Sequence, residues 1–324
     1  MNKTDYAYSV AYIRAIENKL LTKADIENLI TAKSPDEALQ LLLDKGYGRE
    51  KISPYQFETL LKEQLDFCWN EVNSVAPKGS PLDLLLYKND FHNLKAAIKG
   101  VLTGKKDLSP YILIPDSVDV RQMVSAAANA DFSDLPEPFA SVGAKAYDVL
   151  TRTGDSQLAD IILDKAAMDF TLKKAEETKN EFLTGYFELL NTVSDIKIAV
   201  RCAKTAKNRT FAEEALSEKS LINRDGLITA ALSGFDAVAD YVNQSGFPEI
   251  AAALKESMSE FERVTDNMIT DYLKRSGYVS LGIEPLVSYI HSKQLEVQTV
   301  RIIMSAKLHH LSEDVIRSKL REFA

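Results

Sequence analysis

The feature that most constrains the fold of this chain is a short pattern that occurs three times at nearly constant spacing. Each copy begins with a polar or acidic residue, has a small polar residue three positions later and a basic residue five positions later. Aliphatic residues occupy positions four and eight, which lie on one face of a helix. The copies begin at Asp90, Thr192 and Glu296, so their starts are 102 and 104 residues apart. A fainter copy runs from Asp5 to Arg14.

The segments that follow these copies are also alike. Leu20–Thr22, Leu113–Pro115 and Leu221–Asn223 each end a connection and precede another run of apolar residues at helical spacing. A repeat of about 100 residues with similar connections predicts tandem structural units. We therefore expect three similar helical lobes in tandem, spanning residues 1–110, 111–215 and 216–324.

Helix-start signals are frequent along the chain. Thr22, Ser34 and Ser53 are each followed three residues later by Asp, Glu or Gln, which is the spacing of a capping box. The 13 Gly and 10 Pro are fewer than an average chain of 324 residues contains, which favours long elements with short connections. The one short strand candidate, Tyr111–Ile114, is flanked by prolines. The sequence therefore predicts an all-α fold.

Charge and hydropathy narrow the class of protein. A net charge of −8 disfavours a nucleic-acid partner, which requires a basic face. No apolar run approaches the ~20 residues that cross a bilayer, and the first residues lack the apolar core of a signal peptide. Cys68 and Cys202 follow no metal or redox spacing and lie in apolar helical stretches, so we expect buried thiols. We expect a cytoplasmic protein without a membrane span.

The sequence contains no recognisable catalytic or metal-binding pattern. Gly100–Lys106 has three residues between its glycines, whereas a phosphate-binding loop needs four and a Ser or Thr after its Lys. His310 and Glu313 could share a helix face, but a metal site needs three or four converging ligands. We expect no catalytic residue, no metal site, no cofactor and no small-molecule substrate.

The basic residues recur at fixed positions of the repeat. Lys99 and Arg201 occupy one position, while Lys95, Lys197 and Arg301 occupy another. In one interpretation they form ion pairs between lobes with the acidic residues of the copies. In the other, bases of successive lobes line a surface that receives a partner. The candidate residues for either role are Arg14, Asp90, Lys99, Asp195, Arg201, Glu296 and Arg301.

A series of short motifs in the last third of the chain resembles a known family. Together with Tyr12–Glu17 and Leu20–Thr22, their order and spacing are similar to the C-type subunits of archaeal and bacterial A/V-type rotary ATPases, relatives of the eukaryotic d-type subunit. The resemblance runs from about Tyr6 to Arg317, and Asp195 stands where the family usually has Asn. The motifs are Phe261–Arg263, Asp266-Asn267, Tyr272–Lys274, Tyr278-Val279, Gly282, Glu284–Leu286, Tyr289-Ile290, Glu296, Val300–Ile303 and Lys307.

The resemblance implies a fold and a role. It implies a funnel of three similar helical lobes in a pseudo-threefold arrangement, whose cavity receives the foot of the central stalk with its D- and F-type subunits. The other face would lie on the cytoplasmic side of the membrane proteolipid ring, so that the subunit is attached peripherally to the inner face of the membrane. Such a subunit has no active site; it links ATP hydrolysis or synthesis to proton or sodium transport. The alternatives are a helical-repeat scaffold of an unrelated assembly and, less favoured, an all-helical enzyme.

Overall fold

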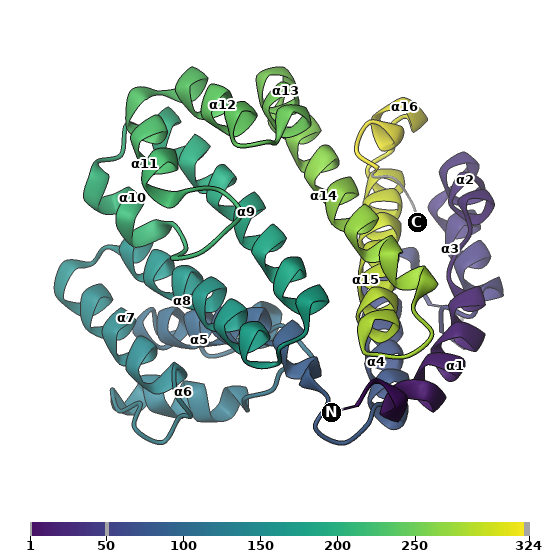
Figure 1. Cartoon of the computed structure of the whole chain (residues 1–324). Coiled ribbons are helices and arrows are strands. Elements are labelled where there is room, and N and C mark those ends of the chain that lie inside the picture. The colour runs from purple at the N-terminus through teal and green to yellow at the C-terminus, as the bar shows by residue number, and fades with distance from the viewer. Residues whose placement is uncertain (1, 49–51, 321–324) are drawn as a thin grey trace. The chain divides into compact units, whose positions relative to one another are not determined.

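The regular structure of the chain is helical throughout the part that the computed structural model describes, residues 2–48 and 52–320 (Figure 1). The prediction of an all-α fold is confirmed for these residues. The strand candidate Tyr111–Ile114 is wrong, because Ser109–Tyr111 forms the short 3-10 turn η5 and the chain after it is irregular. The side-chain amide of Asn93 donates to the carbonyl of Leu113 at 2.9 Å and accepts from its N–H at 2.8 Å. One side chain thus satisfies the backbone N–H and carbonyl of Leu113, which in a strand would bond to a neighbouring strand.

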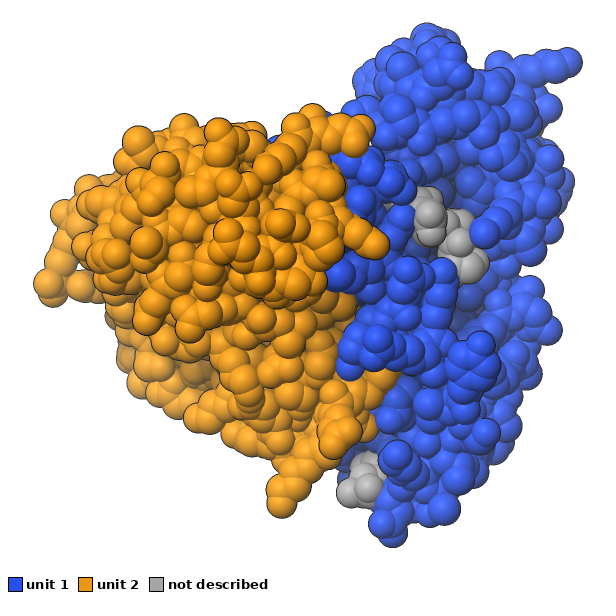
Figure 2. Space-filling model, turned by 45° about the horizontal axis from the view of Figure 1, so that its top comes forward, with its two compact units in different colours: residues 1–80, 257–324 blue, residues 81–256 orange. Residues whose placement is uncertain are grey.

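The chain divides into two compact units, coloured separately in Figure 2. Unit 1 contains residues 1–80 and 257–324, and unit 2 contains residues 81–256. Unit 1 is therefore built from two stretches far apart in the sequence, whereas unit 2 is continuous. The lobe boundaries at residues 110 and 215 stay a prediction.

Unit 1 is built around one long helix, α15 (Glu284–Leu308), whose residues are buried on most sides. Val297, Val300, Ile303 and Met304 of this helix pack in one hydrophobic core with residues of the first stretch such as Leu42. A helix that is apolar around most of its circumference is stable only inside a core. The described helices of unit 1 besides α15 are η1 (Lys3–Tyr6), α1 (Ala7–Ile16), η2 (Glu17–Lys19), α2 (Lys23–Thr31), α3 (Pro35–Asp44), η3 (Pro54–Gln56), α4 (Phe57–Val75), α14 (Met258–Lys274), η6 (Arg275–Tyr278) and α16 (Glu313–Arg317).

The helix boundaries of unit 1 follow the predicted caps. Thr22 accepts from the N–H of Asp25 at 3.2 Å, and Ser34 accepts from the N–H of Glu37 at 3.1 Å. Each bond satisfies a donor that the first turn of a helix leaves without an intrahelical partner. After α3 the chain turns at Gly46, whose φ of +88° lies in the region that favours glycine. The predictions of helix starts at Thr22 and Ser34 are therefore confirmed.

Unit 2 begins with an aromatic cluster around α5 (Tyr87–Leu102). The rings of Phe91 and Phe139 have centroids 4.7 Å apart, and Phe170 lies 4.8 Å from Tyr87. These rings and the aliphatic residues of α5 form one buried core. The remaining helices of unit 2 are η4 (Pro81–Leu85), η5 (Ser109–Tyr111), α6 (Val120–Asn129), α7 (Phe139–Thr153), α8 (Ser156–Glu177), α9 (Glu181–Lys204), α10 (Arg209–Ala215), α11 (Arg224–Ser233), α12 (Phe235–Gln244) and α13 (Pro248–Glu256).

Candidate functional site

The first copy of the repeat lies on α5, and its polar residues bind the connection that leads to α6. Asp90 is buried, and its carboxylate accepts from the N–H and the hydroxyl of Ser117 at 2.8 and 2.5 Å and from the N–H of Val118 at 3.2 Å. Burial raises the pKa of Asp90, while the hydrogen bonds from Ser117 and Val118 act in the opposite direction. Asp90 therefore fixes the backbone just before the N-cap of α6, which is Asp119.

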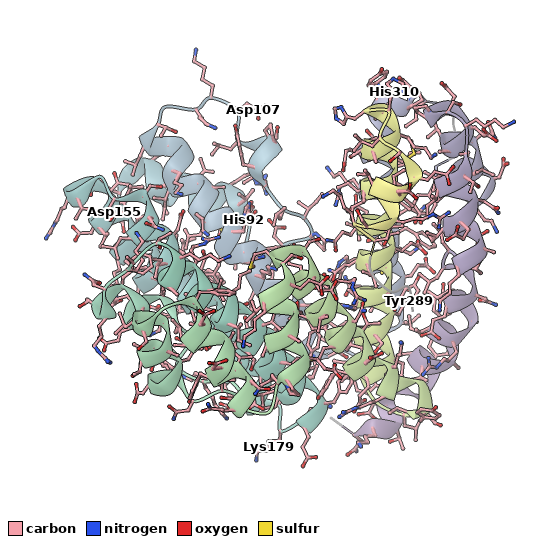
Figure 3. All side chains as sticks on the ribbon, turned by 90° about the horizontal axis from the view of Figure 1, so that it is seen from above. His92, Asp107, Asp155, Lys179, Tyr289 and His310 are labelled. Atoms are coloured by element: carbon pink, nitrogen blue, oxygen red, sulfur yellow. The ribbon has the colours of Figure 1, made fainter. Side chains whose placement is uncertain are left out.

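Other side chains of α5 bind the same connection. Asn93 forms two hydrogen bonds with the backbone of Leu113, as described above. The amide of Asn89 donates to the carbonyl of Pro115 at 2.9 Å. His92, labelled in Figure 3, lies with its Nε2 3.0 Å from the carbonyl oxygen of Tyr111. One polar face of α5 thus determines the path of residues 111–118.

The second copy, on α9, makes equivalent contacts. Asp195 is buried and accepts from the N–H and the hydroxyl of Ser217 at 2.9 and 2.6 Å. The hydroxyl of Thr192 accepts from the N–H of Leu221 at 2.9 Å, two residues before Asn223, the N-cap of α11. Burial raises the pKa of Asp195 to about 6, although the Ser217 hydrogen bonds lower it. In this unit the first and fourth residues of both copies hold the connection that follows them.

The third copy, on α15, makes its contact with the beginning of the chain. The carboxylate of Glu296 is fully buried and accepts from the N–H of Leu21 at 2.5 Å, one residue before Thr22, the N-cap of α2. The same carboxylate accepts from the hydroxyl of Tyr47 and the ammonium of Lys293, both at 2.5 Å. Burial and the adjacent Glu296 carboxylate raise the pKa of Tyr47 well above its ordinary value. An ion pair without solvent access is stable only when hydrogen bonds satisfy it in this way.

The three copies therefore share one contact, which we call the first-residue contact. In each, the first residue of the pattern accepts a hydrogen bond from a backbone N–H one or two residues before the N-cap of another helix. This contact aligns Val118 with Leu21, so the equivalence of Leu113–Pro115 with Leu20–Thr22 expected from the sequence is wrong by several residues. The likeness of Leu-Ile to Leu-Leu misled the alignment, because the matching positions in the first copy are Ser117 and Val118.

The basic residues form ion pairs with carboxylates that the sequence analysis did not select. Lys95 lies 2.5 Å from Asp164, and Lys99 lies 2.7 Å from Asp160, both on α8. The acidic residues of the copies instead accept hydrogen bonds from backbone N–H and hydroxyl groups of the connections. The prediction that these acids are the ion-pair partners of the bases is therefore wrong for Lys95 and Lys99.

The bases of unit 1 are also paired locally. Arg301 lies 2.8 Å from Glu58 of α4, on the surface. Arg14 lies 2.8 Å from Glu17 and donates to the carbonyl of Ser276 at 2.8 Å. The prediction that the acidic residues of the copies pair with the bases is also wrong for Arg301, whose partner is Glu58 and not Glu296. Whether any of these residues binds another protein stays a prediction.

Arg201 differs from the other candidates. It is exposed in the last turn of α9, and the structure gives its guanidinium no ion pair with any residue in the described ranges. Arg201 therefore lacks the ion pair that Lys99 forms at the same position of the repeat. Tyr47, Lys293 and Ser217 were missed by the sequence analysis, although the three-residue spacing of Lys293 and Glu296 on one helix is a signal that could have indicated their pairing.

The two sequence features that were weighed as a phosphate-binding loop and as a metal site have ordinary structural roles. Gly100–Lys106 is the C-terminal end of α5, where Gly104 has a φ of +67°, so the loop lies at the end of the helix that repels anions. His310 follows α15 and Glu313 begins α16, so the two do not share a helix face. In the ranges 2–48 and 52–320, no three His, Cys, Asp or Glu residues are grouped as metal ligands.

Two further properties bear on the class of protein. Cys68 and Cys202 are buried free thiols, as predicted, and burial raises the pKa of Cys68 to about 12. No described helix has both the length and the apolar character needed to cross a membrane.

The chain matches the family model of the ATP synthase (C/AC39) subunit over residues 9–319. It is 25% identical to the C-type subunit of the A-type ATP synthase of Methanocaldococcus jannaschii, over 97% of this chain and 86% of that protein. It is 20% identical to the C-type subunit of the V-type sodium ATPase of Enterococcus hirae, over 96% of each. It is also 20% identical to the C-type subunit of the V-type ATP synthase of Deinococcus radiodurans, over 98% of this chain and 91% of that protein.

The chain is thus an all-helical subunit of the kind found in ion-translocating ATPases. It belongs to the ATP synthase (C/AC39) subunit family.

Proposed function

We propose that this protein is the non-catalytic connector between the central stalk and the membrane proteolipid ring of an A/V-type rotary ATPase. In this role it binds the D- and F-type stalk subunits on one side and the ring on the other. It transmits torque between the ATP-hydrolysing or synthesising head and the ring, which moves protons or sodium ions. It lies on the cytoplasmic side and is attached to the membrane peripherally, through the ring.

The observation that supports this proposal most strongly is the extent of the family match. The family model covers residues 9–319, and the C-type subunits of A-type and V-type ATPases align over nearly the whole chain. A match of this length includes both compact units. The proposal therefore concerns the whole protein and not one fragment of it.

We propose in addition that the chain forms three similar lobes in a funnel with approximate threefold symmetry. The first-residue contact supports this arrangement, because α5, α9 and α15 each bind a connection through the same position of the repeat. The third connection comes from the N-terminal part of the chain, so one lobe combines both ends of the sequence. Connections that are held by hydrogen bonds stiffen each lobe, which suits a subunit that transmits torque.

Most of the candidate residues have internal roles in this proposal. Asp90, Asp195 and Glu296 position connections, and Lys99 and Arg301 join helices through ion pairs. Arg14 pairs with Glu17 and donates to the carbonyl of Ser276. Arg201 is then the remaining candidate for direct contact with a partner. A scaffold of an unrelated assembly would explain the helical repeats but not the family match.

Co-purification tests the proposal. The tagged full-length protein is expressed with the D- and F-type stalk subunits and the proteolipid ring of the same assembly, and the bound subunits are identified after purification. We expect both the stalk and the ring to be retained. In membranes, deletion of this subunit should leave ATP hydrolysis by the head in place while ATP-driven ion transport is lost.

Two results would contradict the proposal. One is a purified protein that retains neither stalk nor ring subunits at micromolar concentration. The other is ATP turnover by the isolated chain, which would favour the enzyme alternative.

A further inference from the structure

The C-terminal end of α9 and the turn after it concentrate positive charge in an acidic protein. The stretch from Ile196 to Ala212 contains five basic residues and no carboxylate, although the chain has a net charge of −8. We call four of these residues, all in unit 2, the α9 basic cluster. They are Arg201, Lys204, Lys207 and Arg209.

The contacts of the cluster within the described chain leave most of its charge without a counter-charge. Arg201 and Lys204 are exposed, and neither forms an ion pair with a described residue. Lys207 donates to the side-chain carbonyl of Gln157 at 2.8 Å, which is a neutral partner. Arg209 is 3.6 Å from the carboxylate of Glu213, the one ion pair that the described chain gives to these four residues.

Two carboxylates of the nearby helix α8 already form ion pairs with lysines of α5. Asp160 pairs with Lys99 and Asp164 pairs with Lys95. The described carboxylates of α8 thus provide counter-charges for Lys95 and Lys99 but none for Arg201 and Lys204.

Two lysines of the cluster rest on aromatic rings. The ammonium of Lys204 is 5.0 Å from the ring centroid of Phe235, and that of Lys207 is 4.5 Å from Phe211. A ring face attracts a cation without neutralising its charge. The two ammonium groups are therefore held close to the surface, where they can still bind an external anion.

The stability of α9 does not explain so many bases. One or two cations in the last turn complement the negative end of the helix dipole. Further cations three or four residues apart repel each other and destabilise the helix. A surface that retains this repulsion in the free protein gains most when a negatively charged group neutralises it.

We propose that the α9 basic cluster receives an acidic segment of a stalk subunit. This inference rests on the proposed function, to which it adds the contact surface and the chemistry of the partner. Arginine binds carboxylates through two parallel hydrogen bonds, and lysine adds charge without a fixed geometry. A short acidic segment fits the cluster better than a long polyanion, because Glu213 and Glu214 follow directly on α10 and the rest of the chain is acidic.

Charge reversal with a matched control tests the inference. The double variant Arg201→Glu/Lys204→Glu and the control Lys88→Glu/Lys106→Glu change the net charge equally, and all four residues are exposed in unit 2. Binding of each full-length protein to the purified D- and F-type stalk subunits is measured by calorimetry at low and high salt. We expect the cluster variant to bind at least tenfold more weakly and with less dependence on salt. The control should stay within twofold of the wild type.

Zero-length cross-linking gives a readout of position. A carbodiimide joins lysine amines to carboxylates in direct contact, but it does not join arginine. In the complex with the stalk subunits we expect cross-links from Lys204 or Lys207 to aspartate or glutamate of a stalk subunit. The variant Lys204→Arg/Lys207→Arg keeps the charge, so it should lose these cross-links and keep its affinity.

The outcomes separate this inference from the proposed function. If the wild type binds no stalk subunit, the proposed function is wrong and the inference with it. If the wild type binds and the cluster variant binds equally well, or no cross-link forms at Lys204 or Lys207, the inference alone is wrong. Reversal that abolishes binding to anionic phospholipid vesicles while the stalk affinity is unchanged would also overturn it. If the reversed variant melts earlier than the wild type, Arg201→Gln/Lys204→Gln replaces it, with a smaller loss of affinity expected.

Discussion

Glu296 and Leu21 lie 275 positions apart in the sequence, yet the carboxylate of Glu296 accepts the backbone N–H of Leu21 at 2.5 Å inside unit 1. Tyr47 and Lys293 complete the coordination of this carboxylate. The contact joins the last long helix of the chain to the start of α2. Its polar groups are buried, so its integrity should matter for stability far more than any surface ion pair does.

Replacement of Glu296 by Gln should destabilise the protein strongly. It leaves the buried ammonium of Lys293 without its counter-charge, and breaking a buried pair in this way costs about 3–5 kcal/mol. Urea unfolding followed by circular dichroism measures the change. Asp271→Asn on α14 is the control, because Asp271 also pairs with a lysine three residues away, Lys274, but on the surface. Equal stability of Glu296→Gln and wild type would show that the pair contributes nothing. The double variant Lys293→Met/Glu296→Gln should recover part of the loss.

The stability of the wild type should depend on the titration of Asp195. Its folded-state pKa of about 6 lies above the ordinary value of 3.8, so the folded state takes up the proton first as the pH falls. Protonation of Asp195 therefore stabilises the folded state at low pH, and this contribution to the free energy of unfolding is lost as the pH rises through 6. Between pH 4.5 and pH 7 the free energy of unfolding of the wild type should fall by about 2 kcal/mol relative to that of Asp195→Asn. Asn keeps an oxygen for the N–H of Ser217.

Unfolding by urea at several pH values tests this dependence. The exposed Asp240→Asn is the control and should follow the wild type. If the free energy of unfolding changes with pH in the same way for the wild type and Asp195→Asn, the pKa of Asp195 is not raised.

Replacement of Asn93 by Ala should loosen the connection between α5 and α6. The variant loses both hydrogen bonds to Leu113 and leaves backbone groups unsatisfied, at a cost of about 1–3 kcal/mol. Hydrogen exchange should be faster at the amide of Leu113 than in the wild type. Asn89→Ala removes one bond to the carbonyl of Pro115 and should not affect the Leu113 amide as strongly. Unchanged exchange at Leu113 would mean that other contacts hold this segment.

The Arg301–Glu58 ion pair should contribute little to the stability of the folded protein. Both side chains are about half exposed, and pairs of this kind are worth about 0.2–1 kcal/mol. A double-mutant cycle with Arg301→Ala and Glu58→Ala measures the coupling energy. It should fall within that range at low salt and decrease at high salt. A coupling well above it would indicate that Arg301 has a structural role that its exposure does not suggest.

Local signals in the sequence predicted the helices well, because caps such as Thr22 and Ser34 act within four residues. The strand candidate Tyr111–Ile114 failed for a reason that no local pattern contains. The backbone N–H and carbonyl of its Leu113 bond to Asn93, which lies on a helix 20 residues earlier. The repeat was visible because its polar residues recur with helical periodicity.

The partners of those residues could not be predicted in the same way. Lys99 pairs with Asp160 across two helices, and nothing in either segment specifies the other. Glu296 binds Tyr47 and Leu21, which requires knowledge of which stretches meet in unit 1. The first two copies bind the connection that follows them, whereas the third binds one from the opposite end of the chain.

The discontinuity of unit 1 has a consequence for biosynthesis. The apolar faces of α2, α3 and α4 are covered by Val297, Val300 and Ile303 of α15, which the ribosome makes after all of unit 2. During translation unit 2 emerges complete while unit 1 still has an open core. A chain that stops before α15 therefore exposes an apolar surface that chaperones and proteases recognise. Quality control can thus separate unfinished copies from full-length ones before either reaches an assembly.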